Sequence, residues 1–355
     1  MRKHITKFVV FLGLIGVISC DEEADKPIDT GFLHGMFVVN EGNFNSNNGS
    51  ITYYDPDSAI TVNKLFQEIN GRQLGDVVQS FGVADDKGFI VVNNSKKVEV
   101  VDMETFVSLG TITGADYPRY FLKVTERKGY LTNGALAGLV FVIDFETLTV
   151  TGQIEVGYGP ENLIQWSDYV FVANSGGWAN DNTVQVIDPD SDTAIESIVV
   201  GDNPVDLAAD KNGDIWVLCK GKVVYDDNWM IVEESDSKIT VFDGTQFNII
   251  KSFVIGRTGD YFNPLHLAAS HDGSYIYFLE SDGIYKMDIT GNSSPEIPLI
   301  KKNFYGMDVD VNNGNIYGLD ARGFLENGYL FRYSSSGSLI DSIEVGMGPN
   351  GVVVN

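Results

Sequence analysis

The chain has 355 residues with 24 basic and 49 acidic side chains, a formal net charge of −25 at pH 7. This excess of negative charge repels phosphate backbones and argues against nucleic acid as a partner. Hydrophobic residues make up 43% of the chain and charged residues 21%, which excludes a disordered protein and allows a large core. The 38 glycines, 21 phenylalanines and 16 tyrosines favour many short strands joined by tight turns.

The N-terminal end has the pattern of a secretory signal peptide. Arg2, Lys3 and Lys7 precede an apolar run over 8–18, which is too short to span a bilayer because a span takes about 20 residues. The run ends at Cys20 and resembles a bacterial lipobox, in which the cysteine receives the lipid and becomes the first mature residue. The alternative is an ordinary secretory signal in which Cys20 is incidental.

The residues that follow the cysteine are acidic. The run 21–25 resembles the surface-export signal of lipoproteins of Bacteroidetes, and the alternative is a solvated linker. We therefore expect a signal peptide over 1–19 and a lipidated acidic linker over 20–33. The protein would be anchored to the outer membrane by its lipid alone and exposed at the cell surface.

A repeated unit runs through the rest of the chain, 34–355, which we expect to be one domain. Each unit has an apolar strand, an Asn-rich break, a second strand ending in Asp, a turn, a third strand ending in Gly, and a Pro. The marker residue recurs at spacings of 47, 42, 44, 55, 45 and 46, at Asp55, Asp102, Asp144, Asp188, Asp243, Asp288 and Ser334. A period of about 45 residues with several strands per unit is typical of β-propellers. The sequence predicts an all-β, seven-bladed propeller with four-stranded antiparallel blades.

The first and last units predict how the ring closes. Each Pro is followed by an apolar stretch, such as 205–208, which we expect to form the innermost strand of the next blade. The first unit lacks this piece and begins at Met36, whereas the C-terminus has a spare strand over 351–354. We expect that C-terminal strand to complete the first blade. Cys219 ends an apolar strand and is predicted to be a buried, structural thiol.

The loops between strands fall into two sets on opposite faces. One set carries plain turn residues, at 85–88, 211–214, 271–273 and 312–314. The other set is rich in Asn and aromatic residues, which can orient a ligand by hydrogen bonds and offer flat apolar contact. An insertion over 220–237 adds Trp and Tyr to the second set, which is typical of a functional loop. The alternative interpretation of this insertion is a decorated surface hairpin. The alternative to a ligand-binding role is structural: Asn residues tolerate left-handed turns, and the aromatic residues pad the junctions between blades.

Several segments carry a family resemblance. Val184–Asp188 and the Gly-x-x-Pro that follows resemble the YVTN repeat of surface-layer propellers. Segments 40–44, 74–80, 91–95 and 114–120 resemble seven-bladed surface-lipoprotein propellers of Bacteroidetes, most densely in the first two blades. Some of those proteins capture cobalamin and hand it to an outer-membrane TonB-dependent transporter. The resemblance implies that the ligand is cobalamin or another corrinoid and that the partner is such a transporter.

A corrinoid is large, flat and ringed with amides, so amide and aromatic side chains of the Asn-rich face suit it. A rigid ring of blades would also lose little entropy on binding. We expect ten side chains to bind the ligand: Asn43, Phe44, Asn94, Tyr117, Arg119, Tyr158, Trp178, Trp229, Tyr261 and Tyr305.

Two other functions remain open. The protein could bind glycans or proteins, with Trp178 and Trp229 as stacking platforms for sugars. Some propellers instead hydrolyse lactones with a metal held over the central channel, and Glu41, Asn93, Asn133 and Asn174 could hold such a metal. The sequence contains no zinc-protease, nucleophile-elbow or phosphate-loop motif. We therefore expect no catalytic residues, no resident metal and no catalytic cofactor.

Overall fold

The computed structural model describes residues 31–32, 34–256 and 266–354. The predicted signal peptide, the predicted lipidation site Cys20 and most of the linker lie outside the described residues. So does Tyr261, one of the ten predicted ligand residues. Within the described ranges no helix is both long and apolar enough to cross a membrane.

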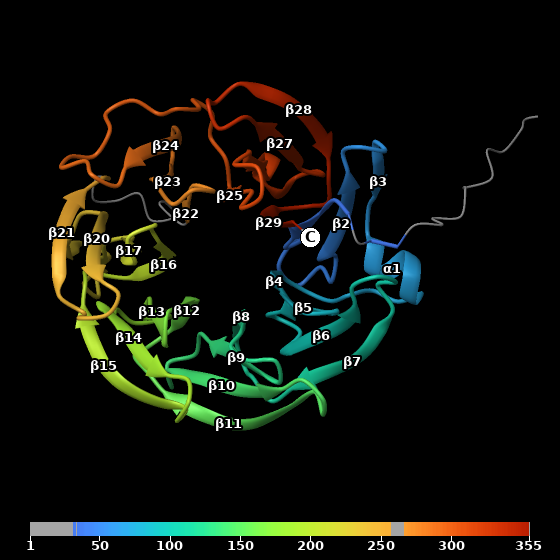
Figure 1. Ribbon diagram of the computed structural model, residues 1–355, viewed down its shortest axis with the longest axis horizontal. Helices are drawn as coiled ribbons and strands as arrows, with labels where there is room; N and C mark the ends of the chain where they lie inside the picture. The colour runs from blue at the N-terminus through green and yellow to red at the C-terminus, as the bar shows by residue number, and fades with distance from the viewer. Residues whose placement is uncertain (1–30, 33, 257–265, 355) are drawn as a thin grey trace, which may run out of the picture. The chain divides into compact units, whose positions relative to one another are not determined.

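In the unit from Phe32 onward, antiparallel sheets follow one another around a ring (Figure 1). Each sheet is a blade, and its strands are given from the innermost outward. The first four blades are β29 (Pro349–Val354), β1 (Met36–Asn40), β2 (Ser50–Asp55), β3 (Ile60–Val62); β4 (Val78–Ala84), β5 (Lys87–Val92), β6 (Lys97–Asp102), β7 (Ser108–Thr113); β8 (Pro118–Lys123), β9 (Lys128–Asn133), β10 (Leu139–Asp144), β11 (Thr149–Glu155); and β12 (Pro160–Trp166), β13 (Tyr169–Asn174), β14 (Thr183–Asp188), β15 (Thr193–Val199).

The remaining blades follow the same order. They are β16 (Pro204–Ala209), β17 (Asp214–Cys219), β20 (Lys238–Asp243), β21 (Ile249–Val254); β22 (Leu267–Ala269), β23 (Tyr275–Glu280), β24 (Gly283–Asp288); and β25 (Gly306–Val309), β26 (Ile316–Asp320), β27 (Tyr329–Tyr333), β28 (Leu339–Glu344). Innermost strands of neighbouring blades contact each other around the hub. The predicted seven-bladed propeller is therefore confirmed.

The C-terminal strand completes the first blade, as the sequence predicts. β29 lies antiparallel to β1, and Met36, Phe37 and Val38 pair with Val354, Val353 and Val352. Hydrogen bonds thus join the two ends of the propeller and leave no open edge at the junction.

The Asp marker of the repeat ends the third strand of its blade and begins the outer turn. The Asp102 Oδ1 atom accepts a hydrogen bond from the Thr105 amide at 2.8 Å, and the Asp243 Oδ1 atom accepts one from the Thr245 amide at 2.8 Å. In the last blade the Ser334 Oγ atom accepts from the Ser338 amide at 3.2 Å. A short side-chain acceptor stabilises such a turn by satisfying backbone donors that the strand no longer pairs.

Hydrophobic side chains fill the space between neighbouring blades. Phe37 of the first blade packs against Phe81 and Phe106 of the second, with ring centroids 5.5 and 5.4 Å apart. Phe171 and Phe242 join the fourth and fifth blades at 5.5 Å. Each such cluster draws on two blades, so a single sheet could not bury both of its faces.

The sixth blade departs from the predicted four strands. Its outer position holds only one bridge, in which the Ile284 and Ile300 amides each donate to the other's carbonyl, at 2.9 and 3.2 Å. Pro295 and Pro298 lie in the segment before that bridge. Proline has no amide hydrogen to donate, and this explains why a longer outer strand does not form.

The insertion after β17 forms a hairpin of β18 (Val223–Tyr225) and β19 (Ile231–Glu234). The sequence did not predict the two short helices, α1 (Leu65–Asn70) beside β3 and η1 (Arg322–Phe324). Cys219, the last residue of β17, is fully buried, and burial raises its pKa to about 12. It is a structural thiol, as predicted.

Candidate functional site

A cavity of about 700 Å³ lies at the hub on one face of the propeller. Its described lining residues come from the beginnings of innermost strands and from loops between the second and third strands of blades, such as 41–44 and 175–180. None of these lining residues comes from the plain turns at 85–88, 211–214, 271–273 and 312–314. The face predicted to be functional is thus the face that carries the cavity.

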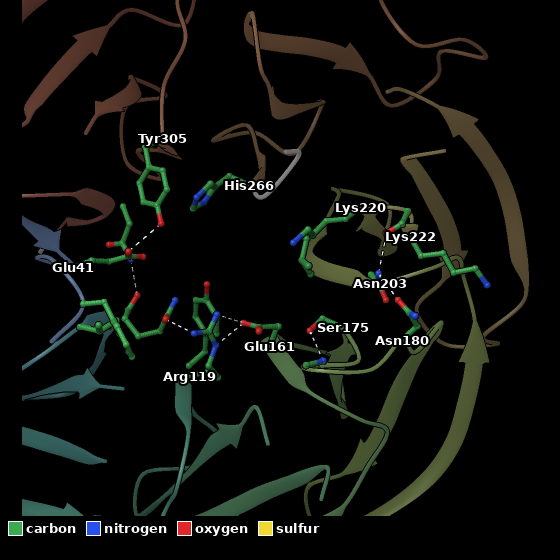
Figure 2. A pocket seen from close by; sticks show the side chains of 18 of the residues that line it. Glu41, Arg119, Glu161, Ser175, Asn180, Asn203, Lys220, Lys222, His266 and Tyr305 are labelled. Carbon is green, nitrogen blue, oxygen red and sulfur yellow. Dashed lines mark hydrogen bonds and ion pairs between the residues drawn. The ribbon is translucent and has the colours of Figure 1, made fainter. Parts of the chain in front are cut away.

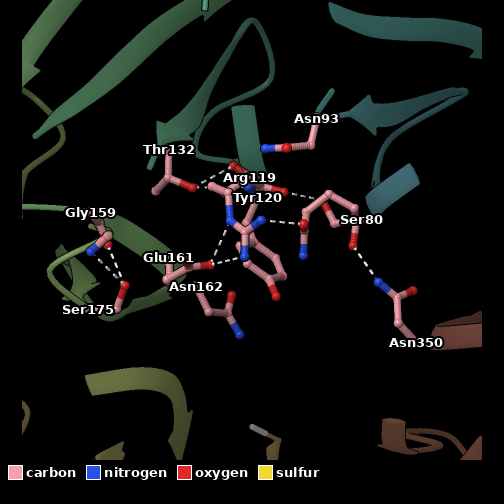
Figure 3. Close-up of polar contacts among 12 residues, drawn as sticks. Ser80, Asn93, Arg119, Tyr120, Thr132, Gly159, Glu161, Asn162, Ser175 and Asn350 are labelled. Atoms are coloured by element: carbon pink, nitrogen blue, oxygen red, sulfur yellow. Dashed lines mark hydrogen bonds and ion pairs between the residues drawn. The ribbon is translucent and has the colours of Figure 1, made fainter. Parts of the chain in front are cut away.

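An ion pair crosses the cavity wall between the third and fourth blades. The Arg119 Nε atom donates to the Glu161 Oε2 atom at 2.8 Å (Figure 3). An Nη1 hydrogen of the same guanidinium donates to the Gln79 side-chain oxygen. Burial alone would lower the pKa of Arg119, but the carboxylate of Glu161 outweighs it and the pKa is raised. Arg119 is therefore a fixed cation held by neighbours from two other blades.

A second polar cluster joins the first, second and last blades. The Tyr305 hydroxyl donates to Glu41 Oε2 at 3.0 Å, and Asn350 Nδ2 donates to Glu41 Oε1 at 2.8 Å and to the Gln79 carbonyl at 2.9 Å. Burial raises the pKa of Glu41, although both hydrogen bonds favour its charged form. The cluster fixes the orientation of the Asn350 amide, because its nitrogen already serves two acceptors.

Three amide oxygens in the cavity lining are buried without a hydrogen-bond partner among the described residues. They are the Oδ1 atoms of Asn43, Asn203 and Asn350. Buried polar atoms in folded proteins are nearly always paired, so these acceptors are available to a hydrogen-bond donor, which a water molecule or a ligand in the cavity can supply.

Lys220 and His266 also line the cavity. Figure 2 shows the Lys220 side chain extending toward the open centre. Burial lowers the pKa of Lys220, and it lowers the pKa of His266 to about 4, so the imidazole is neutral at physiological pH.

Four of the ten predicted ligand residues line the cavity: Asn43, Phe44, Arg119 and Tyr305. Phe44 has 69% of its surface exposed, and Tyr305 packs edge-on against Phe324 at 5.0 Å. The structure brings these four together from three blades, although they are far apart in sequence.

The other described predicted residues lie away from the cavity lining. Tyr117, Tyr158, Trp178 and Trp229 are 40%, 54%, 79% and 82% exposed, and Asn94 donates to the Asn45 Oδ1 atom at 3.2 Å. The loop around Trp178 contributes other residues to the lining, but not the indole. Aromatic type therefore identified two residues of the cavity wall, Phe44 and Tyr305, together with four exposed residues that do not line it.

Of the four residues considered for a lactonase metal, only Glu41 lines the cavity. The Asn93 amide donates to the Pro118 carbonyl at 3.0 Å, and the Asn133 oxygen accepts from the Tyr117 amide at 2.7 Å. Asn174 is fully buried and donates to Thr183 Oγ1 at 3.0 Å. Among the described residues there is no group of three or more His, Cys, Asp or Glu side chains placed to hold a metal ion.

The repeat proline marks part of the cavity wall in the sequence. In four blades, the residue directly after the repeat proline lines the cavity; these are Arg119, Glu161, Val205 and Asn350. The proline begins the innermost strand, and the next side chain faces the hub. This position would have identified Glu161 and Asn350, whereas nothing in the local sequence marks Lys220, Asn203 or His266.

Known proteins share this fold. Similar solved structures include a quinonprotein alcohol dehydrogenase-like protein from Bacteroides thetaiotaomicron, with TM-score 0.68 and 15% identity, covering 92% of this chain and 79% of that one. A candidate 6-phosphogluconolactonase from Bacteroides fragilis has a TM-score of 0.65 and 14% identity, covering 92% of this chain and 99% of that one. Apo AztD from Citrobacter koseri has a TM-score of 0.55 and 10% identity, covering 90% of this chain and 96% of that one. At such low identity the likeness shows the fold alone.

No curated protein matches the sequence. A family model described as "Domain of unknown function (DUF5074)" matches residues 34–347, which is nearly the whole propeller. The chain therefore belongs to the DUF5074 family.

Proposed function

We propose that this protein binds a polar small molecule in the hub cavity and does not catalyse a reaction. The observation that carries the proposal is the group of orphaned amide oxygens of Asn43, Asn203 and Asn350 in one cavity. Such acceptors have lost water on burial, and a ligand with several N–H donors would restore their hydrogen bonds. A hydrocarbon ligand would leave them unpaired.

The ligand we propose is cobalamin or another corrinoid. Its flat ring carries amide groups around the edge, which can donate to the asparagine oxygens and accept from donors on the wall. The exposed ring of Phe44 offers an apolar surface at the cavity. The polar clusters around Arg119 and Glu41 hold the wall in place before binding, which reduces the entropy lost by the protein.

Calorimetry with cyanocobalamin tests this proposal. We expect the purified protein to bind it one to one at micromolar concentration or below. Asn43→Ala, which removes an orphaned oxygen, should weaken binding on the order of tenfold. Asn212→Ala, an exposed amide in a turn outside the lining, should leave the affinity unchanged. Absence of heat at micromolar concentrations would remove the corrinoid proposal.

Cell-surface delivery is the second part of the proposal. It is supported by the lipobox-like sequence ending at Cys20 and the acidic run after it. A lipid-anchored propeller could pass its ligand to a TonB-dependent transporter in the same membrane. Labelling of cells with radioactive palmitate should mark the wild-type protein and not Cys20→Ala, and the transporter should co-purify with the labelled protein. Equal labelling of both forms would contradict the anchor.

Glycan binding is a second candidate, favoured by the exposed indoles of Trp178 and Trp229, which are 79% and 82% exposed. Bare indole faces stack well on sugar rings. A glycan array separates the two candidates. Glycan binding that is lost in Trp178→Ala and Trp229→Ala, without any binding of corrinoids, would favour this alternative.

A further inference from the structure

Lys220 is the one cation among the described lining residues whose side chain forms no direct ion pair or hydrogen bond. It follows β17, at the start of the insertion, and its side chain points into the cavity (Figure 2). Its ammonium forms no ion pair or hydrogen bond with any described residue, although its backbone groups are bonded to Asn203 and Ser237.

The other two basic side chains of the lining are neutralised within the protein. Arg119 pairs with Glu161 at 2.8 Å. Lys222 pairs with Glu233 at 2.6 Å and with Asp202 at 3.7 Å, and Figure 2 shows it pointing away from the centre. A lysine without an ion pair stands out in this chain, because the chain has 49 acidic residues and only 24 basic ones.

Glu161 attracts the Lys220 ammonium through space but forms no ion pair with it, and the nearby Arg119 repels it. Glu161 is already engaged by Arg119, and the burial of Glu41 raises its pKa and so favours its neutral form. Among the described lining residues, the Lys220 ammonium therefore lacks a counter-ion in direct contact, in a strongly acidic protein. An ammonium that is removed from water without a counter-ion is unfavourable, and an anionic partner would relieve that penalty.

We propose that Lys220 anchors an anionic group of the ligand, a phosphate or a carboxylate. The inference rests on the proposed ligand-binding function and adds to it a requirement for negative charge on the ligand near the insertion. In a corrinoid with a complete nucleotide loop, the phosphodiester is the group that meets this requirement. A charge-assisted hydrogen bond of this kind contributes on the order of 10- to 100-fold in affinity.

Calorimetry with two corrinoids tests the proposal. Cyanocobalamin carries the phosphodiester, and dicyanocobinamide lacks it. We expect the wild-type protein to bind cyanocobalamin at least tenfold more tightly, and Lys220→Met to lose that preference. Lys211→Met removes the same charge from an exposed turn outside the lining, and it should keep the preference. Equal binding of both corrinoids by the wild type, or an unchanged preference in Lys220→Met, would overturn the role of Lys220.

A second measurement decides the matter if neither corrinoid binds, which would refute the proposed ligand but not the anion site. The melting temperature is measured with inorganic phosphate, with acetate and with chloride at equal ionic strength. Phosphate or acetate should raise the melting temperature above the chloride value in the wild type and in Lys211→Met, but not in Lys220→Met. The anion that acts distinguishes a phosphate site from a carboxylate site. No shift that depends on Lys220 would overturn the proposal.

Discussion

Arg119 and Glu161 meet across the junction of the third and fourth blades, with the Arg119 Nε atom 2.8 Å from Glu161 Oε2. Each is the residue directly after the proline that begins an innermost strand. The repeat therefore places opposite charges at equivalent positions of adjacent blades, where they form one wall of the cavity.

The first prediction concerns the strength of this pair. Arg119→Met and Glu161→Gln should each lower the free energy of unfolding by about 1–3 kcal/mol, because each leaves a partly buried charge unpaired. The double variant should lose less than the sum, by about 0.5–3 kcal/mol of coupling. Urea unfolding measures all three. Lys87→Met, which breaks the more exposed pair with Asp86, should change stability by less than about 1 kcal/mol. Strict additivity would contradict the coupling.

The second prediction concerns closure of the ring. Val352 of β29 is 8% exposed and packs with the last blade, whereas Ile340 of β28 is 48% exposed. Val352→Asp should destabilise the protein by at least about 3 kcal/mol, since it buries an unpaired charge at the closing strand. Ile340→Asp should cost less than about 1 kcal/mol. Calorimetric melting compares the two, and similar losses would contradict the role assigned to β29.

The third prediction concerns Asp206, a buried carboxyl near the hub. Burial raises its pKa to about 7, although it accepts hydrogen bonds from the amides of Leu207 and Leu267, each at 2.8 Å. Between pH 4 and 7 the folded state then binds the extra proton, so this group lowers stability as pH rises, by up to about 4 kcal/mol. Asp206→Asn should remove that slope in urea unfolding at pH 4, 5.5 and 7. The exposed Asp57→Asn should retain it, and an unchanged slope in Asp206→Asn would contradict the assignment.

The fourth prediction has the opposite sign. Burial lowers the pKa of His266 to about 4, below its unfolded value of about 6.5. Between these values the unfolded state binds more protons, so this group makes stability rise with pH, by up to about 3 kcal/mol. His266→Asn should remove the rise, whereas the surface variant His271→Asn should keep it. Identical pH profiles for wild type and His266→Asn would show that the imidazole is not buried in its neutral form.

Together, His266 and Asp206 should partly cancel in the wild type, because their pH windows overlap and their signs differ. Each variant is therefore more informative than the wild-type profile alone. The Asp206→Asn profile should rise more steeply with pH than that of the wild type between pH 4 and 6.5.

The architecture could be predicted from the sequence because its signals are local. The Asp marker shapes a turn within three residues of itself, as Asp102 does with Thr105, and the alternation of strands needs only neighbouring residues. The sequence signal for the missing outer strand of the sixth blade is also local, because it consists of Pro295 and Pro298. A prediction based on the repeat period overlooks this signal. Ring closure followed from a spare strand at one end and a missing strand at the other.

Most of the site could not be predicted, since it depends on contacts between distant residues. Glu41 is bonded to Asn350, 309 residues away. Whether Lys220 is paired depends on the geometry of the hub, and composition carries no information about it. Residue type also favoured Trp178 and Trp229, which are exposed instead of lining the cavity, because chemical suitability does not determine where a side chain points.

The central claim is that the hub cavity is the ligand site, and a crystal structure of the protein with cyanocobalamin tests it most directly. The account predicts ligand density in the cavity, with donors within hydrogen-bonding distance of the Asn43, Asn203 and Asn350 oxygens. An empty cavity with the ligand bound on the β18–β19 hairpin, on the opposite face or nowhere would contradict it.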